Sequence, residues 1–187
     1  MQAPHTLDPM PAHPAGPRHE DISHPLAHSD PPADLNALDA TVWPTHAERV
    51  DGVLTLAGIP VTEAMAQFGS PLFMLDEQHF RHAARSYVQA YADADVYYAA
   101  KAFLAGRIAQ WADEEGLRID VCSYGEMEIA LRAGVDPARM LFHGNNKSET
   151  ELRRALQVGI GRIVIDSFAE IERLRALAVE MGVTPKT

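Results

Sequence analysis

The stretch LRIDVCSYGEMEIALRAG, residues 117–134, contains the unit from which most of this chain is built. Residues 117–123 form a short, largely apolar run, which is typical of a buried β-strand. Residues from about 125 to 133 then predict a helix, and Gly134 predicts its end, because glycine readily adopts the left-handed conformation that closes a helix. A strand followed by a helix is the building unit of α/β proteins.

The same unit recurs on both sides of this stretch. Apolar runs at 71–76, 95–102, 139–144 and 162–167 each precede a predicted helix, at about 77–92, 104–115, 149–158 and 168–181. Ser148 is the expected N-cap of the helix at 149–158, and Gly159 is its expected end. Five strand–helix units in succession, with near-continuous apolar strands, indicate a parallel sheet that is buried on both faces.

Two α/β architectures fit this alternation, a doubly wound sheet and a (β/α)8 barrel. The first strand lacks the Gly-x-Gly-x-x-Gly turn of dinucleotide-binding sheets. Polar residues stand at the carboxyl ends of all five strands, and such ends all converge on one mouth only in a barrel. We therefore predict a partial (β/α)8 TIM-type barrel of about five β/α units. The polar strand-end residues are Asp76, Lys101, Asp120 with Ser123, His143 with Asn145, and Asp166 with Ser167.

Composition and pattern divide the chain into three parts. Residues 1–45 are rich in Pro and His and poor in residues that build a core, so a disordered tail is predicted. Residues 46–69 predict a strand/helix segment, in which GVLTLAGIPV (52–61) reads as a strand or hairpin and a helix follows between Thr62 as N-cap and Gly69. Residues 70–187 form the predicted barrel part. The tail histidines are irregularly spaced and no cysteine accompanies them, so no metal site is predicted; they are His5, His13, His19, His24 and His28.

The bulk properties exclude several classes of function. A net charge of −10 and a pI near 5.3 argue against binding to nucleic acid, which needs clustered Lys and Arg. The sequence contains no run of about twenty apolar residues, so no membrane span is predicted. Its first residues do not resemble a secretory signal. The single cysteine, Cys122, cannot form an intrachain disulfide, which fits a reducing compartment. We therefore expect a cytoplasmic protein.

Lys101 is the residue that most clearly suggests chemistry. The chain has only three lysines, Lys101, Lys147 and Lys186, and the first stands at the end of an apolar strand. One interpretation is a strand-end lysine whose amine extends into water. The other is a desolvated amine that acts as a nucleophile towards an aldehyde, for which pyridoxal phosphate is the economical partner. Asp120 and Glu126 either position this lysine and cofactor or serve the next helix as a cap and a solvated acid.

Three motifs together resemble the amino-terminal half of bacterial diaminopimelate decarboxylase, a member of the alanine-racemase-like pyridoxal-phosphate enzymes. They are YYAAKAFL (97–104), the stretch from LRIDVCSYGE (117–126) to HGNNKSETEL (143–152), and RIVIDSFAEIERL (162–174). The resemblance extends from about Leu35 to about Met181. The motif HGNNKS favours the diaminopimelate branch over ornithine and arginine decarboxylases. GVLTLAGIPV resembles the amino-terminal strands of the family's β domain, most of which is missing here.

The resemblance implies pyridoxal-phosphate-dependent decarboxylation of meso-diaminopimelate to L-lysine and CO2, the last step of bacterial lysine synthesis. Lys101 would carry the Schiff base, and Asp120 and Glu126 match acids near the cofactor and the lysine. Further cofactor-binding candidates at the same mouth are Ser123, His143 and Asn145, although His143 has the alternative of holding a loop carbonyl. Cys122 is interpreted as a small buried side chain without a catalytic role. The family also implies a homodimer that acts on a small amino acid.

The chain departs from the family's pattern in its extent. Five of the eight barrel units are present, and the family's Gly-rich phosphate loops, its acid for the pyridine nitrogen and its substrate-binding Arg and Tyr residues are not among them. We therefore expect an amino-terminal fragment that is inactive alone. Two alternatives stay open: a non-catalytic truncated protein of the pyridoxal-phosphate barrel type, which would bind the cofactor weakly or not at all, and an ornithine- or arginine-type decarboxylase of the same fold.

Overall fold

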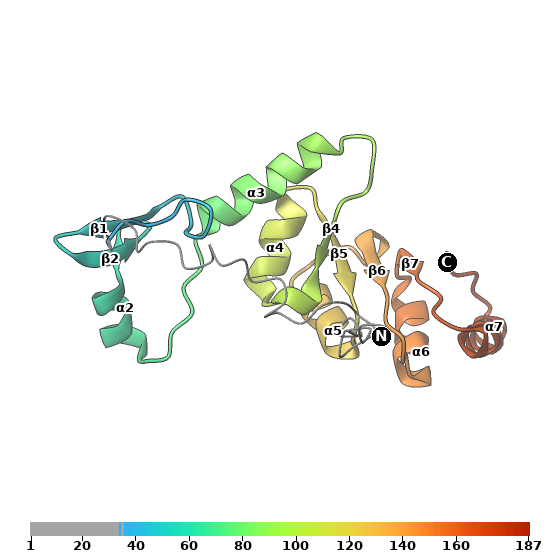
Figure 1. Cartoon of the computed structure of the whole chain (residues 1–187). Coiled ribbons are helices and arrows are strands. Elements are labelled where there is room, and N and C mark those ends of the chain that lie inside the picture. The colour runs from blue at the N-terminus through green and yellow to red at the C-terminus, as the bar shows by residue number, and fades with distance from the viewer. Residues whose placement is uncertain (1–33, 35) are drawn as a thin grey trace, which may run out of the picture.

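The computed structural model describes residue 34 and residues 36–187 (Figure 1). Most of the predicted disordered tail, residues 1–45, lies outside the described residues. An antiparallel sheet with one helix comes first in the described part, and a parallel sheet with its helices follows. The helix α3 (Glu77–Ala90) leads from the first unit to the second (Figure 1).

The amino-terminal unit is built on two tight turns. The antiparallel strands β1 (Ala47–Val50), β2 (Val53–Leu56) and β3 (Ile59–Pro60) are joined by the two-residue loops Asp51–Gly52 and Ala57–Gly58. All four loop residues have positive φ, between 50° and 80°, which is typical of the type I′ turns that match the twist of a hairpin. The hairpin predicted within residues 52–61 is confirmed.

The helix α2 (Val61–Phe68) begins two residues earlier than predicted. Thr62 is not its N-cap, because β3 leads directly into the helix and Pro60 occupies the capping position without a side-chain hydrogen bond. The predicted end is confirmed, since Gly69 closes the helix with a φ of 85°.

Four strands form the parallel sheet, and they lie side by side in chain order. Tyr97 pairs with Arg118 and Ile119 pairs with Met140, so each strand finds its neighbour in the next unit along the chain. The strands are β4 (Tyr97–Ala99), β5 (Arg118–Val121), β6 (Met140–Phe142) and β7 (Arg162–Ile163). The other helices of this part are η2 (Ala100–Ala102), α4 (Gly106–Glu114), α5 (Tyr124–Arg132), η3 (Pro137–Arg139), α6 (Glu149–Val158) and α7 (Phe168–Met181).

Local capping explains why two helices have the predicted limits. At α6, the Ser148 hydroxyl accepts a hydrogen bond from the backbone N–H of Glu151, and the Glu151 carboxylate accepts one from the Ser148 N–H. This reciprocal arrangement satisfies two backbone donors at the start of the helix. Gly159 closes α6 in the left-handed conformation, and α7 also ends at its predicted residue, Met181.

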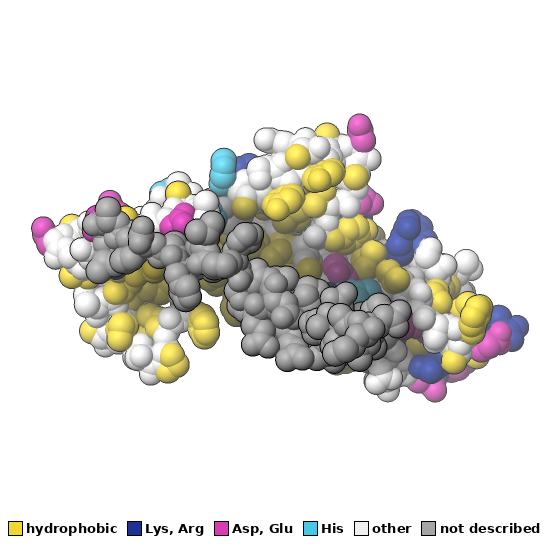
Figure 2. All heavy atoms as spheres, in the orientation of Figure 1, with side chains coloured by type: hydrophobic (Ala, Val, Ile, Leu, Met, Phe, Trp, Pro, Cys, Tyr) yellow, Lys and Arg dark blue, Asp and Glu magenta, His cyan; other side chains and the backbone are white. Residues whose placement is uncertain are grey.

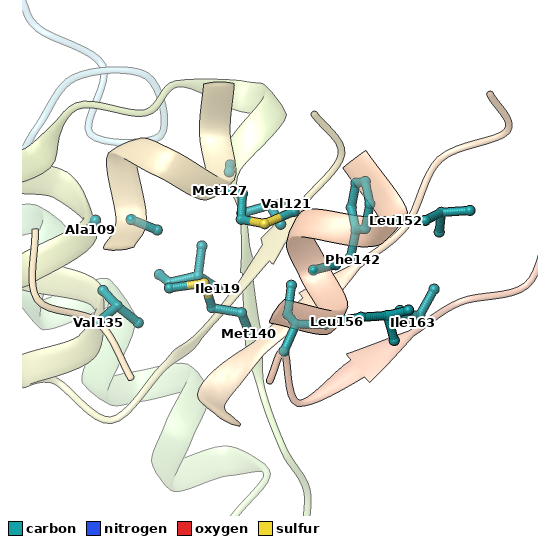
Figure 3. Close-up of a cluster of buried hydrophobic side chains, with 14 of the residues drawn as sticks. Ala109, Ile119, Val121, Met127, Val135, Met140, Phe142, Leu152, Leu156 and Ile163 are labelled. Atoms are coloured by element: carbon teal, nitrogen blue, oxygen red, sulfur yellow. The ribbon is translucent and has the colours of Figure 1, made fainter. Parts of the chain in front are cut away.

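The core of the parallel sheet lies on one face, beneath the helices (Figure 3). Ile119 and Val121 of β5, together with Met140 and Phe142 of β6, are almost completely buried there. The alternate residues, such as Asp120, lie on the other face and are partly exposed. The prediction that the strands are buried on both faces therefore holds for one face only, because the described helices cover that face alone.

The strand predicted at 71–76 is not formed. Residues 72–76 belong to no regular element among the described residues, and β4 is an edge of the sheet. The alternating apolar residues of this segment face the amino-terminal unit instead. Leu72 and Met74 line a cleft together with apolar side chains of β2 and α2. Phe73, which lies between them, is 92% exposed. The segment thus packs against the amino-terminal unit, and the parallel sheet has four strands where the sequence predicted five.

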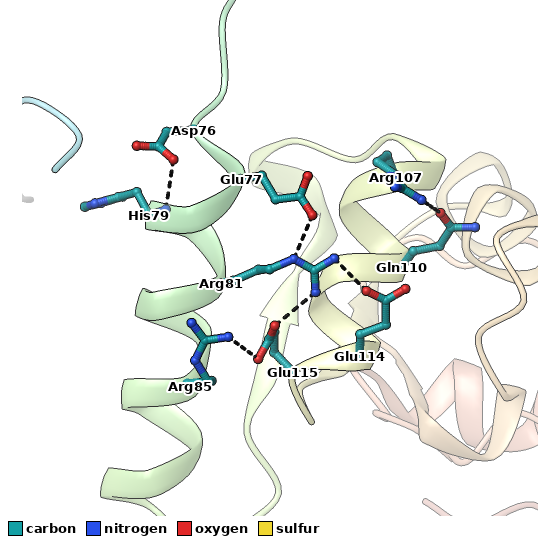
Figure 4. Close-up of polar contacts among 9 residues, drawn as sticks. All are labelled: Asp76, Glu77, His79, Arg81, Arg85, Arg107, Gln110, Glu114 and Glu115. Atoms are coloured by element: carbon teal, nitrogen blue, oxygen red, sulfur yellow. Dashed lines mark hydrogen bonds and ion pairs between the residues drawn. The ribbon is translucent and has the colours of Figure 1, made fainter. Parts of the chain in front are cut away.

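Asp76 joins the two units of the structure. Its carboxylate is buried and accepts a hydrogen bond from the His79 backbone N–H at 3.0 Å, which makes it the N-cap of α3 (Figure 4). The other carboxylate oxygen lies 2.7 Å from His46 Nδ1, in the amino-terminal unit. Burial raises the pKa of this carboxyl, but the bonds from His79 and His46 outweigh it, so the pKa lies below the ordinary aspartate value.

Replacing Asp76 should reveal this junction as acid sensitivity. A carboxyl with a lowered pKa in the folded state contributes stability at neutral pH, and that contribution is lost as the pH falls below about 4. Asp76→Ala should cost about 1 kcal/mol at pH 7 through the lost cap. Asp76→Asn should keep the cap but not the acid sensitivity. Urea midpoints at pH 7 and at lower pH check this, and an equal acid loss in wild type and Asp76→Asn would contradict it.

Arg81 holds α3 against α4. Its guanidinium contacts Glu77 on its own helix at 2.8 Å, and Glu114 and Glu115 at the end of α4 at 2.6 and 2.9 Å (Figure 4). The hydrogen bonds that Arg81 donates to the carboxylates of Glu114, Glu77 and Glu115 raise the pKa of Arg81 above its ordinary value. The group also lies 5.8 Å from the centre of the Trp111 ring. These contacts fix α3 and α4 to one another, next to the edge strand β4.

The surface of the amino-terminal unit is markedly apolar. Figure 2 shows hydrophobic side chains gathered there, and Met65 and Phe68 of α2 are among the exposed residues.

In the part of the chain that the structure describes, no helix combines the length and the apolar character that a membrane crossing requires.

Candidate active site

The candidate residues gather where the parallel strands end. Lys101 stands in η2, directly after β4, and the Asp120 and His143 side chains lie at the ends of β5 and β6. Ala99 pairs with Asp120, and Asp120 pairs with Leu141, two residues before His143. These residues therefore share the sheet face that the helices leave uncovered.

Lys101 is exposed, as expected of a strand-end lysine that reaches water. The interpretation in which burial desolvates its amine is not borne out. Among residue 34 and residues 36–187, no hydrogen bond or ion pair engages the Lys101 amine. Lys101, Asp120 and Glu126 all influence the Cys122 thiol, so they share one neighbourhood. The pKa of that thiol is raised by burial first and then by the hydrogen bond and charge of Glu126 and the charge of Asp120, while Lys101 opposes the rise.

Asp120 and His143 form a pair that the sequence did not reveal. Asp120 Oδ1 lies 2.5 Å from His143 Nδ1, and both side chains are largely shielded from water. The alternative in which His143 Nδ1 holds a loop carbonyl is not found, since this nitrogen faces the Asp120 carboxylate instead. The pairing leaves Nε2 as the ring nitrogen available to a ligand. The signal that could have indicated it is the parallel register, which places the two residues on adjacent strands and the same face.

Ser123 and Glu126 build the corner between β5 and α5. The Ser123 hydroxyl accepts a hydrogen bond from the Glu126 N–H at 3.3 Å, so Ser123 is the N-cap of α5. The Glu126 carboxylate reaches back and accepts a hydrogen bond from the Cys122 N–H at 2.7 Å. The other carboxylate oxygen of Glu126 lies 3.5 Å from the Cys122 thiol, so both oxygens of Glu126 contact Cys122. In this structure both residues thus hold the end of β5, and neither is a solvated acid or a free hydroxyl.

A cleft of about 470 Å³ opens beside these residues. We call it the polar cleft, and its lining consists of Cys122, His143, Gly144, Asn145, Asn146, Val164 and Asp166. Cys122 is half-buried, which differs from its predicted buried state, and Asn145 is exposed at the rim. A larger cleft of about 650 Å³ lies along α7, but its lining is mostly apolar and contains no Lys, Cys, His, Asp or Glu side chain.

Lys147 is a structural residue that the sequence reasoning missed. Its side chain is buried, and its amine donates to the Gly144 carbonyl at 2.5 Å and lies 2.8 Å from Glu170 Oε1. This contact with Glu170 is an ion pair whose geometry does not satisfy a hydrogen bond. Arg173 donates to the Lys147 carbonyl at 2.7 Å. The loop that carries His143 and Asn145 is thereby tied to the first turns of α7.

Comparisons with known proteins agree with this arrangement. Residues 77–184 match the family described as "Pyridoxal-dependent decarboxylase, pyridoxal binding domain". The chain belongs to this family. The predicted resemblance is thus confirmed, and pyridoxal phosphate is the cofactor of the family.

Within this family, the chain is similar to proteins named diaminopimelate decarboxylase. The chain is 46% identical over 179 residues to diaminopimelate decarboxylase of Mycobacterium leprae, covering 93% of this chain and 38% of that protein. It is 47% identical over 152 residues to the enzyme of the same name from Mycobacterium tuberculosis, covering 80% of this chain and 34% of the relative. The chain therefore spans little more than a third of the length of these relatives.

A solved structure confirms the fold class. The crystal structure of diaminopimelate decarboxylase from M. jannaschii in complex with L-lysine superimposes with a TM-score of 0.69 at 25% sequence identity. The match covers 76% of this chain and 35% of that one. The parallel sheet and its helices thus correspond to part of the barrel of a pyridoxal-dependent decarboxylase, as the strand-end residues predicted.

Proposed function

We propose that the protein decarboxylates meso-diaminopimelate to L-lysine and CO2 with pyridoxal phosphate as cofactor. The observation that carries this proposal is an exposed Lys101 side chain whose charge acts on Cys122 of the polar cleft, in a chain that is 46% identical to diaminopimelate decarboxylase of M. leprae. The activity belongs to the whole protein, since the chain spans only 38% of that relative.

The side chains at the cleft fit this cofactor in their chemistry. A primary amine that no described side chain engages is available to bond with an aldehyde. The cofactor, when bound, accepts the electron pair that the substrate's carboxylate leaves behind as it departs as CO2. The remaining work falls to the protein, which binds, orients and transfers protons.

We assign roles to the candidate residues from their contacts. Lys101 holds the cofactor through its amine. Asp120 fixes the orientation of the His143 ring through the 2.5 Å contact, so His143 presents Nε2 to the cofactor or substrate. Asn145 offers amide groups at the rim of the polar cleft. Ser123 and Glu126 keep the end of β5 in place, and through it Asp120.

The family resemblance also leads us to propose a homodimer and a cytoplasmic location for the whole protein. The acidic net charge of −10 is compatible with a role that involves no nucleic acid. The mass of the complete protein in solution tests the dimer.

The three lysines provide a direct test of the cofactor assignment. The chain is mixed with pyridoxal phosphate, reduced with borohydride and mapped by mass spectrometry. The lysine nitrogen bonds to the aldehyde carbon, the oxygen leaves as water, and borohydride supplies the hydride that makes the bond permanent. We expect one cofactor on Lys101, little on exposed Lys186 and none on buried Lys147.

The matched control is Lys101→Arg, which keeps the positive charge but cannot form this bond. It should lose the modification at position 101 and change nothing at Lys186. An adduct that is equally distributed over Lys101 and Lys186, or absent from Lys101, would refute the cofactor assignment.

The substrate is tested separately with the protein as its gene encodes it. CO2 and L-lysine are measured with meso-diaminopimelate, and ornithine and arginine are assayed in parallel. Preferred turnover of meso-diaminopimelate supports the proposal. Preferred turnover of ornithine or arginine would establish the related decarboxylase instead, and a Lys101 adduct without any turnover would indicate a non-catalytic pyridoxal-binding protein.

A further inference from the structure

The turn that carries Lys101 is bridged by a neighbouring side chain. Tyr98 lies in β4, and its hydroxyl donates to the Phe103 carbonyl at 2.6 Å. The bridge encloses residues 99–102, which include all of η2 and therefore Lys101. Phe103 itself has extended backbone, with a φ of −171°, so the chain leaves the turn directly at the bonded carbonyl.

The bridging ring is anchored in the core. Tyr98 pairs with Ile119 across the sheet, which places its ring on the helix-covered face, opposite to Asp120. The ring meets Phe80 of α3 edge-on, with 5.5 Å between their centres, and Phe80 contacts Trp111 of α4 at 5.9 Å. The hydroxyl thus extends from this aromatic cluster to a turn in which Ala100 is buried, while Lys101, Ala102 and Phe103 are exposed.

Lys101 has no comparable support of its own. Its side chain is exposed, and within the described residues nothing bonds to its amine. Its position therefore depends on the backbone of η2. A reaction between an amine and a bound aldehyde is sensitive to small displacements of the nucleophile, so support of the turn translates into reactivity.

We infer that Tyr98 is a positioning residue for Lys101, which holds the turn of the cofactor-bonding lysine through the Phe103 carbonyl. This inference deepens the proposed function and rests on it. Burial raises the pKa of the Tyr98 hydroxyl, so the group stays protonated and able to donate throughout the neutral range.

The test compares Tyr98→Phe with Tyr87→Phe by borohydride trapping with pyridoxal phosphate. Tyr87 lies on the exposed side of α3, so its variant removes the same hydroxyl from an unrelated place. The quantity measured is the rate of modification of Lys101 divided by that of Lys186 in the same molecules. Loss of one hydrogen bond should lower this ratio about fivefold in Tyr98→Phe, and Tyr87→Phe should leave it unchanged.

The outcomes separate positioning from general stability and from the proposed function. Lys147 reports unfolding, because it is buried in the native chain and reacts only when the fold opens. A lower ratio with Lys147 still protected supports the inference. An unchanged ratio in Tyr98→Phe, or new modification of Lys147, would overturn it while the role of Lys101 stands. No Lys101 modification in the wild-type chain would overturn the inference together with the cofactor assignment.

Discussion

Replacing Lys147 by methionine is expected to lower the free energy of unfolding by about 3–5 kcal/mol, because it leaves the Glu170 charge buried without the opposite charge that compensates it. The Lys147 and Glu170 side chains are only 1% and 5% exposed. The amine also satisfies the Gly144 carbonyl, which would lose its donor. Chemical denaturation followed by circular dichroism measures the loss.

Two controls identify the cause. Arg175→Met removes an ion pair with Glu172 on the surface of α7, where the side chains are 72% and 69% exposed, so it should cost less than about 1 kcal/mol. The double variant Lys147→Met with Glu170→Leu removes both buried charges and should recover much of the loss. A double variant as unstable as Lys147→Met alone would show that the uncompensated Glu170 charge is not responsible.

Replacing Gly161 by alanine is expected to cost about 3 kcal/mol or more through direct overlap of backbone atoms. A Cβ at this position would lie 2.2 Å from the Ala138 carbonyl oxygen and 2.9 Å from that of Met140. Both neighbours are main-chain atoms, which cannot rotate away. Gly161 also donates from its N–H to the Pro137 carbonyl at 2.8 Å, so any shift would break this contact as well.

Gly125 provides the matched control for this substitution. It lies in the first turn of α5, and a Cβ there would meet no atom within 4 Å. Gly125→Ala should therefore stabilise the chain by roughly 0.5–1 kcal/mol, as expected of a helical glycine. Denaturation midpoints of Gly161→Ala and Gly125→Ala, each compared with wild type, test the two expected changes in stability. Similar midpoints for the two would show that the start of β7 can move away from η3 at little cost.

Features that short stretches of sequence encode could be predicted. Ser148 and Gly159 give α6 its limits because a side-chain cap and a left-handed glycine act on the nearest turns alone. The position of Lys101 at a strand end also followed from the apolar run before it. The repetition of such units indicated an α/β fold, and the polar residues at the strand ends favoured the barrel, at whose mouth the candidate residues were expected.

Features that depend on distant parts of the chain could not be predicted. Residues 71–76 have the pattern of a strand, but Leu72 and Met74 pack on the amino-terminal unit, so the pattern alone did not reveal the partner. The contact between Asp120 and His143 joins two strands and needs the register of the sheet. The ion pair of Lys147 likewise needs Glu170, which belongs to the next unit of the chain.

The order of the parallel sheet has a consequence for how the chain acquires its structure. Successive pairings join residues 21 positions apart, as in Tyr97 with Arg118, Ile119 with Met140, and Leu141 with Arg162. Contacts between nearby parts of a chain form with little loss of loop entropy, so they form quickly. Each strand can add to the sheet as soon as it leaves the ribosome, without waiting for a distant partner. The lysine turn after β4 can therefore take shape while the units that follow it are still being synthesised.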